Sequence, residues 1–148
     1  TLYRDRRPDI QLRMEVVDGL PLIWADAEQL QRLFINLLKN AMEAMKESGE
    51  IMVWAEVDNK QNQLSVEVAD QGEGIPEESK WSVFYPYFST KSRGSGLGLA
   101  ICHRIVSDHN GSITVRDNQP RGSVFRVTFP LAHPSTYVTE MERSAAIG

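Results

Sequence analysis

One long amphipathic segment constrains the fold of this chain more than any other feature. After Asp26, apolar residues recur every three or four positions up to about Ser48, which predicts a helix with one buried face. Asp26 is a good N-cap, Gln29 completes a capping-box pattern, and Gly49 is expected to end the helix. The apolar stripe, which indicates the side facing a core, consists of Leu30, Leu33, Phe34, Leu37, Leu38, Ala41, Ala44 and Met45.

Two asparagines lie beside this stripe. Asn36 and Asn40 are four residues apart, so their side chains share one helix face, with Lys39 and Glu43 behind them. Asn is a mediocre helix former, so the pair needs a reason. It is either a solvated edge or a pair of amide oxygens offered to a metal ion and its phosphates. The segment by itself favours the solvated edge.

Alternating apolar residues predict a sheet as the second layer. A further helix is expected at 97–109, and a short one at 77–81. Strands and helices are mixed without strict alternation, which favours an α+β fold. We predict a two-layer α/β sandwich, with a mixed, mostly antiparallel sheet covered by helices on one face. The predicted strands are 10–17, 22–24, 50–57, 63–69, 112–117 and 123–129.

Length and composition limit the class of protein. The 148 residues predict one domain over 10–131, preceded by a linker (1–9) from a missing upstream domain and followed by a tail (132–148). A net charge of −4 argues against nucleic-acid binding. The single cysteine, Cys102, excludes an internal disulfide, suits a reducing compartment and is expected in the core. No apolar run is long enough to span a membrane, so we expect a soluble fragment without direct membrane contact. We also expect it to be cytoplasmic and monomeric, with a parent protein that is either soluble or anchored in the inner membrane.

A carboxylate and two glycines follow the strand predicted at 63–69. Gly72 and Gly74 would let the backbone approach a ligand closely. The carboxylate of Asp70 can accept a hydrogen bond from the exocyclic amine of adenine, and it would discriminate against a base without that donor. The same residues also suit an ordinary β-turn, which is the better interpretation of the segment alone.

A glycine-rich segment opens the second long helix. Free amides at a helix start form an anion site, and Lys91 and Arg93 beside it can meet a phosphate. The spacing is neither that of a Walker P-loop nor of a dinucleotide fingerprint. Read alone, the segment suits a lid without a ligand as well as it suits an anion site. The two cations, read alone, also suit a solvated basic loop. The three histidines lack metal-ligand spacing.

Five segments in this order resemble the catalytic ATP-binding domain of bacterial sensor histidine kinases, nearest to the nitrogen-regulatory type. Residues 36–44 (NLLKNAMEA) resemble the N box, 70–75 (DQGEGI) the G1 box and 84–91 (FYPYFSTK) the F box. Residues 94–101 (GSGLGLAI) resemble the G2 box, and 121–125 (RGSVF) the end of that domain. The resemblance covers about 10–131 and implies the Bergerat ATP-binding fold.

The resemblance also implies a set of functional residues. Asn40 would coordinate Mg²⁺ through its amide oxygen, and Asn36 would support the same cluster. Asp70 would bind the adenine amine, with Ser123 joining the pocket and Phe88 anchoring the lid. The catalytic residues would be Asn36, Asn40 and Lys91, with ATP and Mg²⁺ bound. The full predicted binding set is Asn36, Lys39, Asn40, Glu43, Asp70, Gly72, Gly74, Ile75, Phe88, Lys91, Arg93, Gly94, Ser95, Gly96, Leu97, Gly98 and Ser123.

The sequence departs from the family pattern at several positions. Arg93 and Arg121 replace glycines, Ser95 a common Thr, and Tyr85 a common acidic residue. Glu43 stands where many sensor kinases have Lys or Arg, although Glu occurs there in the nitrogen-regulatory type. None of the three histidines lies in a phosphoacceptor context. The resemblance therefore implies a catalytic domain whose partners are a separate histidine-containing dimerisation domain and, downstream, a response regulator.

Two alternatives accompany the histidine-kinase interpretation. One is a free-standing serine kinase that acts as an anti-sigma factor. Such enzymes place a Glu four residues before the metal-binding Asn, where this chain has Asn36. An amide cannot act as a general base, which favours a nucleophile that attacks with its own lone pair, as histidine does. The other alternative is a module that binds nucleotide without transferring phosphate, against which the intact motifs argue.

Overall fold

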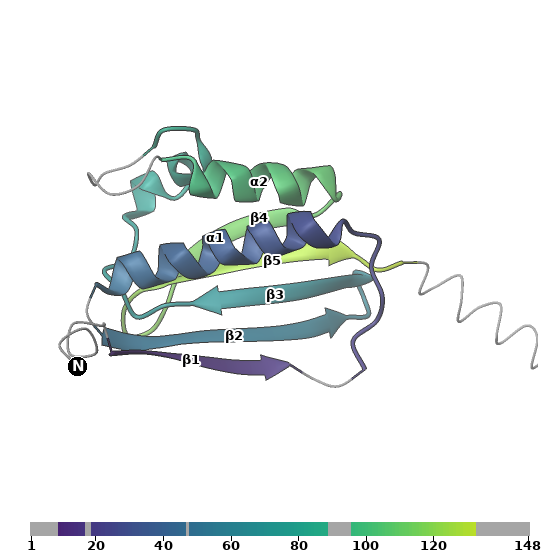
Figure 1. Ribbon diagram of the computed structural model, residues 1–148, viewed down its shortest axis with the longest axis horizontal. Coiled ribbons are helices and arrows are strands. Elements are labelled where there is room, and N and C mark those ends of the chain that lie inside the picture. The colour runs from purple at the N-terminus through teal and green to yellow at the C-terminus, as the bar shows by residue number, and fades with distance from the viewer. Residues whose placement is uncertain (1–8, 17–18, 47, 89–95, 133–148) are drawn as a thin grey trace, which may run out of the picture.

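The computed structural model describes residues 9–16, 19–46, 48–88 and 96–132. Figure 1 shows two layers, with α1 and α2 lying over one face of a sheet. In chain order the elements are β1 (Asp9–Val16), α1 (Ala27–Met45), β2 (Ser48–Asp58), β3 (Gln63–Ala69), the short 3-10 helices η2 (Glu77–Ser79) and η3 (Ser82–Phe84), α2 (Gly98–Asp108), β4 (Ser112–Asp117) and β5 (Ser123–Pro130). The predicted α+β sandwich is confirmed.

The sheet has the strand order β1-β2-β3-β5-β4 in the described residues. Only β1 runs parallel to its neighbour, β2, and the other three pairs are antiparallel. The consecutive strands β2 and β3 form one hairpin, and β4 and β5 form another. β3 and β5 are neighbours in the sheet although they are far apart in the sequence. Asp70, which follows β3, and Ser123, which begins β5, are 53 positions apart. This pairing brings the end of β3 beside the turn between β4 and β5.

The core lies between the helices and the sheet. Every fourth residue of α1 is buried from Leu33 to Met45, as the apolar stripe predicts. These side chains meet Ile51, Val53 and Ala55 of β2, which alternate toward the same side. From α2, Cys102, Ile105 and Val106 complete the helical side, and Phe125, Val127 and Phe129 come from β5.

The ends of α1 differ partly from the prediction. The Asp26 carboxylate caps the helix by accepting from the backbone N–H of Glu28 (3.0 Å) and of Gln29 (3.3 Å). The helix ends earlier than predicted, at Met45, because Lys46 adopts a left-handed φ of 61° that breaks the helical repeat. Gly49 is therefore not the helix stop, since it already lies within β2.

A histidine replaces the second half of the predicted capping box. The backbone N–H of Asp26 donates to Nε2 of His109 (3.1 Å), and Nδ1 of His109 lies 2.7 Å from the carbonyl oxygen of Ile105. His109 is also the C-cap of α2. One imidazole therefore joins the end of α2 to the start of α1, a contact between residues 83 positions apart.

The strand predicted at 22–24 is absent. Leu22 and Trp24 are 84% and 75% exposed, and residues 20–26 form no strand or helix. The carbonyl oxygen of Leu22 accepts a hydrogen bond from the backbone N–H of Ala132 (3.1 Å). Pro21, which has no N–H, also interrupts the run of donors that a strand would need. The local pattern predicts an extended segment, but none of the five strands in the described residues pairs with residues 22–24.

Cys102 is a core residue, as predicted. It is fully buried in α2, and its thiol donates to the carbonyl oxygen of Leu33 across the interface with α1 (3.6 Å). Burial raises the pKa of the Cys102 thiol from 9.0 to about 12. The native state therefore keeps this proton at pH values where the unfolded chain has lost it.

This shift predicts an alkaline loss of stability. The contribution of Cys102 is complete below about pH 9 and is lost as the pH rises toward about 12, at roughly 1.4 kcal/mol per pH unit. Urea unfolding of the wild type and Cys102→Ala should show the stability gap between them narrowing by about 1 kcal/mol from pH 8.5 to 10. A gap that does not change with pH would contradict this assignment.

Within the part of the chain that the structure describes, no helix combines the length and hydropathy that crossing a lipid bilayer requires.

Candidate functional site

The asparagine edge of α1 lies beside the start of α2. Asn36 and Asn40 are half-buried on α1, whereas Lys39 and Glu43 are exposed. A Cβ added to Gly98, the first residue of α2, would lie 3.8 Å from Oδ1 of Asn36. The predicted metal-binding edge and the glycine-rich helix start, 62 positions apart in sequence, therefore come into contact.

Asp70 directly follows β3, and its carboxylate is buried in the interior of the domain. Asp70 is 1% exposed, and its Oδ1 accepts from the backbone N–H of Gly72 (2.9 Å) and of Ser123 (3.2 Å). The backbone N–H of Asp70 donates in turn to the carbonyl oxygen of Ser123 (2.9 Å). Buried carboxylates need such donors, and these contacts hold the carboxylate in one orientation. The structure thus brings the predicted residue Ser123 directly against Asp70.

The segment that follows Asp70 packs closely on α1. A Cβ at Gly72 would lie 2.6 Å from the carbonyl oxygen of Ala44, so only glycine fits there. Gly74 approaches Gly122 across the sheet end, and a Cβ on Gly74 would lie 3.5 Å from its carbonyl oxygen. Ile75 is half-buried against the core. The last turn of α1, the end of β3 and the start of β5 therefore converge.

The turn between β4 and β5 contributes two side chains that are not in the predicted binding set. Nδ2 of Asn118 donates to the carbonyl oxygen of Asp70 (2.8 Å), and Nε of Arg121 donates to the carbonyl oxygen of Gly72 (2.8 Å). In the sequence, Arg121 stood out only as a departure from the family pattern. No local signal predicts which distant carbonyl group it contacts.

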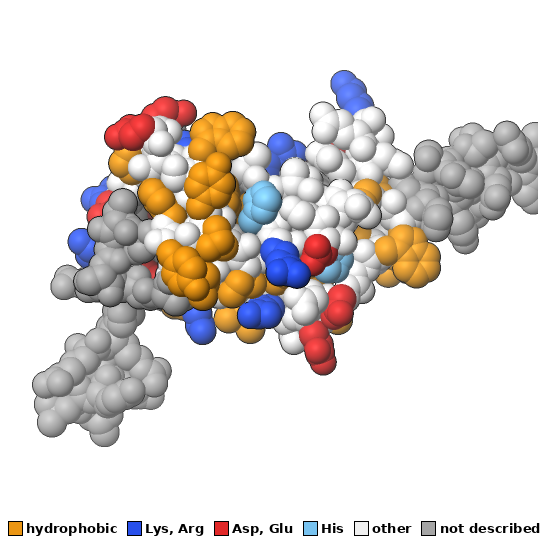
Figure 2. Space-filling model, turned by 90° about the horizontal axis from the view of Figure 1, so that it is seen from above, with side chains coloured by type: hydrophobic (Ala, Val, Ile, Leu, Met, Phe, Trp, Pro, Cys, Tyr) orange, Lys and Arg blue, Asp and Glu red, His pale blue; other side chains and the backbone are white. Residues whose placement is uncertain are grey.

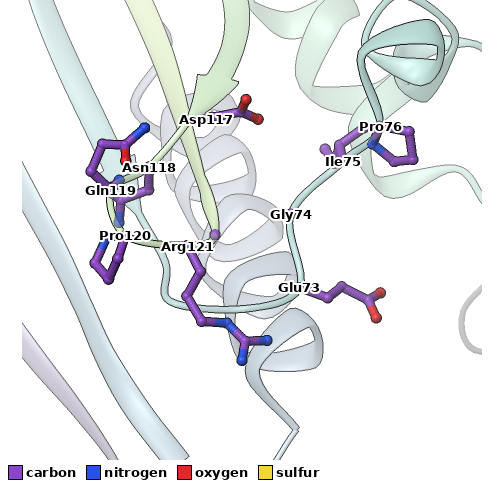
Figure 3. A pocket seen from close by; sticks show the side chains of 10 residues that line it. Glu73, Gly74, Ile75, Pro76, Asp117, Asn118, Gln119, Pro120 and Arg121 are labelled. Atoms are coloured by element: carbon purple, nitrogen blue, oxygen red, sulfur yellow. The ribbon is translucent and has the colours of Figure 1, made fainter.

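A pocket of about 650 Å³ opens between these two segments. Figure 3 shows residues 73–76 on one side and residues 117–121 on the other, with α1 behind them. The pocket includes Gly74 and Ile75, two members of the predicted binding set, together with Gly122. Its wall carries charges of both signs, from Glu73, Asp117 and Arg121.

The glycine-rich segment is described only in part. Gly96, Leu97 and Gly98 are half-buried at the start of α2. The carbonyl oxygen of Gly96 accepts from the backbone N–H of Tyr87 (2.8 Å), and Phe88 lies half-buried beside it in the chain. Four predicted site residues lie outside the described residues: Lys91, Arg93, Gly94 and Ser95.

Exposed aromatic side chains flank this region. Trp81, Tyr85 and Tyr87, between β3 and α2, are all exposed. Figure 2, which views the helical side, shows hydrophobic side chains gathered at the end of the molecule where Figure 1 places this segment.

The described side chains do not form a metal site of their own. Among residues 9–16, 19–46, 48–88 and 96–132, no group of three or more His, Cys, Asp or Glu side chains could hold a metal ion. An amide oxygen on α1 can supply only one ligand, which suits Mg²⁺ completing its shell with phosphates and water. The donor set therefore fits a metal that arrives with a phosphate ligand.

Comparison with known proteins identifies the family. Residues 25–133 match the family of histidine kinase-, DNA gyrase B- and HSP90-like ATPases. The sensor histidine kinase ZraS of Escherichia coli (strain K12) is 40% identical over 83% of this chain and 26% of its own length. The sensory histidine kinase/phosphatase NtrB of Rhodobacter capsulatus is 40% identical over 77% of this chain and 35% of its own length. Sporulation kinase E of Bacillus subtilis is 34% identical over 83% of this chain and 16% of its own length. This chain therefore spans only a fraction of these relatives.

Solved structures give the same assignment. The mycobacterial sensor histidine kinase MprB superposes with a TM-score of 0.76 at 30% identity, over 88% of this chain and 87% of that one. ShkA in complex with AMPPNP gives 0.73 at 28% identity, over 83% and 26%. ThkA in complex with the response regulator TrrA gives 0.70 at 34% identity, over 83% and 34%. The resemblance predicted from the sequence is confirmed: this chain belongs to the histidine kinase-, DNA gyrase B- and HSP90-like ATPase family, as the catalytic domain of a histidine kinase.

Proposed function

We propose that this domain binds Mg-ATP and donates the γ-phosphoryl group to a histidine on a separate dimerisation domain. The observation that carries the proposal is the convergence of three distant segments at α1. Asn36 meets the start of α2 at Gly98, and Ala44 meets Gly72 beyond β3. The related structure of ShkA with AMPPNP supports a nucleotide as the ligand.

Asp70 is the proposed adenine receptor. Its Oδ1 accepts from the backbone N–H groups of Gly72 and Ser123, and we assign the exocyclic amine of adenine to Oδ2 of the same carboxylate. A buried carboxylate in this position rejects a base that presents a carbonyl oxygen, because two acceptors would then face each other. Gly72, Gly74 and Ile75 would form the walls around the base, and Ser123 would complete them.

The edge of α1 is the proposed phosphate and metal side. Asn40 would supply an amide oxygen to Mg²⁺, with Asn36, Lys39 and Glu43 around the same cluster. When bound, Mg²⁺ would neutralise charge on the phosphate oxygens. The segment that opens α2 would wrap the phosphates through its backbone N–H groups. Its proposed members are Lys91, Arg93, Gly94, Ser95, Gly96, Leu97 and Gly98, with Phe88 as the anchor.

The proposed transfer needs no general base on this chain. An unprotonated imidazole nitrogen attacks with its own lone pair, whereas a serine hydroxyl or a water molecule must lose a proton to a base. Asn36 stands where such a base would be required, and its amide cannot accept a proton. The contribution of this chain is therefore to bind, orient and electrostatically stabilise the transferring group, with Lys91 as its proposed cation.

The proposed partners follow from the missing nucleophile. Trp81, Tyr85 and Tyr87 are exposed, Tyr87 donates through its backbone N–H to Gly96 at the proposed phosphate side, and we assign these aromatics to contact with the dimerisation domain. A response regulator would then receive the phosphoryl group, as the related complex of ThkA with TrrA suggests. We also place the domain in the cytoplasm, where ATP is available and Cys102 would stay reduced.

A transfer assay tests this function. The domain is incubated with γ-labelled ATP, Mg²⁺ and the dimerisation domain of its parent kinase. We expect a label on the acceptor that is labile to acid and stable to alkali, as a phosphorus–nitrogen bond is, and only slow hydrolysis without the acceptor. An acid-stable label would indicate a serine kinase. Rapid hydrolysis by the domain alone would indicate an ATPase, and nucleotide binding without transfer would indicate a binding module.

The proposed metal role of Asn40 makes a separate prediction. Asn40→Ala should weaken nucleotide binding in the presence of Mg²⁺ by roughly tenfold, because one ligand oxygen is lost, and should leave binding in EDTA nearly unchanged. Calorimetric titration under both conditions measures the difference. Asn59→Ala, in the exposed turn between β2 and β3, is the control. Retention of the full Mg²⁺ enhancement in Asn40→Ala would move the metal elsewhere.

A further inference from the structure

Two side chains of the turn between β4 and β5 bind the main chain of residues 70–72, which contain the proposed adenine receptor Asp70. Asn118 donates to the carbonyl oxygen of Asp70, and Arg121 donates to that of Gly72, both at 2.8 Å. These two carbonyl groups lie on either side of Gln71. The two hydrogen bonds therefore fix residues 70–72 at the point where the chain leaves β3. The turn is itself closed by the backbone N–H of Asn118, which donates to the carbonyl oxygen of Gly122 (2.9 Å).

The position of residues 70–72 determines the orientation of the Asp70 carboxylate. Oδ1 of Asp70 accepts from the N–H of Gly72 and of Ser123. The first donor belongs to the peptide that joins Gln71 to Gly72, and the second lies at the end of the β4–β5 turn. If Gly72 moves, Oδ1 loses one of its two backbone donors and the carboxylate is held less firmly in its orientation. Arg121 therefore acts on the carboxylate through Gly72, and Asn118 acts through the main chain of Asp70 itself.

We propose that Asn118 and Arg121 are positioning residues for adenine recognition, which hold the Asp70 carboxylate in the orientation that selects the amine. This inference rests on the proposed role of Asp70 as the adenine receptor. Both side chains donate to main-chain carbonyl oxygens, and the inference requires neither of them to contact the nucleotide. Their loss should therefore reduce selectivity for the amine more than it reduces binding of the triphosphate.

The test compares ATP with inosine triphosphate, which carries the same sugar and phosphates but has a carbonyl oxygen in place of the amine. Calorimetric titration of the full chain with each nucleotide and Mg²⁺ gives the ratio of affinities. In Arg121→Ala and in Asn118→Ala we expect ATP affinity to fall roughly fivefold while inosine triphosphate affinity changes less than twofold. The double variant should lower the ratio further. Arg104→Ala on α2 and Asn59→Ala are matched exposed controls.

Arg121→Gln distinguishes a positioning hydrogen bond from a phosphate contact. The side-chain nitrogen of glutamine occupies the same position along the chain as Nε of arginine, so it can donate to the carbonyl oxygen of Gly72 without carrying a charge. We expect Arg121→Gln to keep the wild-type ratio of affinities. Equal losses for both nucleotides in Arg121→Gln and in Arg121→Ala would show that the guanidinium acts as a phosphate charge, which would overturn the inference.

The two levels of the proposal fail differently. If the wild type prefers ATP and both alanine variants keep that preference, the positioning role is wrong and the adenine role of Asp70 stands. If the wild type binds the two nucleotides equally, the adenine role fails and the positioning role fails with it. Melting midpoints of all variants separate a selective effect from a loss of folded protein, which would lower both affinities together.

Discussion

Asp70→Asn is expected to lower the affinity for ATP by roughly a hundredfold while leaving the fold intact, because a buried hydrogen bond to a charged group is lost and a repulsive contact replaces it. The amide oxygen of asparagine can still accept from the N–H groups of Gly72 and Ser123, which occupy Oδ1 in the wild type. The amide nitrogen would then take the place of Oδ2. A donor would face the donor amine of adenine.

The same variant should bind inosine triphosphate comparatively well. Its amide nitrogen can donate to the carbonyl oxygen of hypoxanthine, so the preference for ATP is expected to disappear or reverse. Titration calorimetry with the two nucleotides measures this, and circular dichroism checks that the fold is retained. Asp108→Asn, an exposed carboxylate on α2, is the control. Unchanged ATP affinity in Asp70→Asn would show that the base binds elsewhere.

Gly122→Ala is expected to be the most destabilising of the substitutions considered. A Cβ at this position would lie 2.1 Å from the carbonyl oxygen of Asp70, and φ is +100°, where side chains are strained. The backbone of both segments would have to separate. We expect a loss of about 4 kcal/mol in the free energy of unfolding, from overpacking and backbone strain together.

A matched glycine separates the two causes. Gly19 also has a positive φ, of +75°, but a Cβ there meets nothing within 4 Å. Gly19→Ala should therefore lose only about 1 kcal/mol, from strain alone. Urea unfolding of both variants gives the comparison. Any Gly122→Ala protein that remains folded should also bind ATP weakly, because the clash displaces Asp70. Equal, small losses in both variants would contradict the close contact between the two segments.

The spacing of apolar residues along the sequence was sufficient to predict most of the helices and strands. The apolar stripe from Leu30 to Met45 matches the buried face of α1, and alternation placed the five strands in the described residues. The strand predicted at 22–24 was wrong, since an extended pattern becomes a strand only when another strand pairs with it. Gly49 was wrong as a helix stop, because Lys46 had already left the helical region.

The motifs indicated the chemistry of the site but not its geometry. Asn36, Asn40 and Asp70 could be named as nucleotide ligands because their residue types, in that order, match a family that the comparisons confirm. Their assigned roles remain predictions. The contacts with Gly98 and Ala44 that bring these segments together are tertiary, and no window of sequence contains both partners.

The sequence by itself determined the buried face of α1 and the positions of the five strands, because those properties depend on near neighbours and on residue type. Only the tertiary structure decided that His109 caps the start of α1, and that Arg121 and Asn118 hold the segment around Asp70. These hydrogen bonds join residues 48 to 83 positions apart. Their donors and acceptors meet only after the sheet order has placed β3 beside β5 and α2 beside α1.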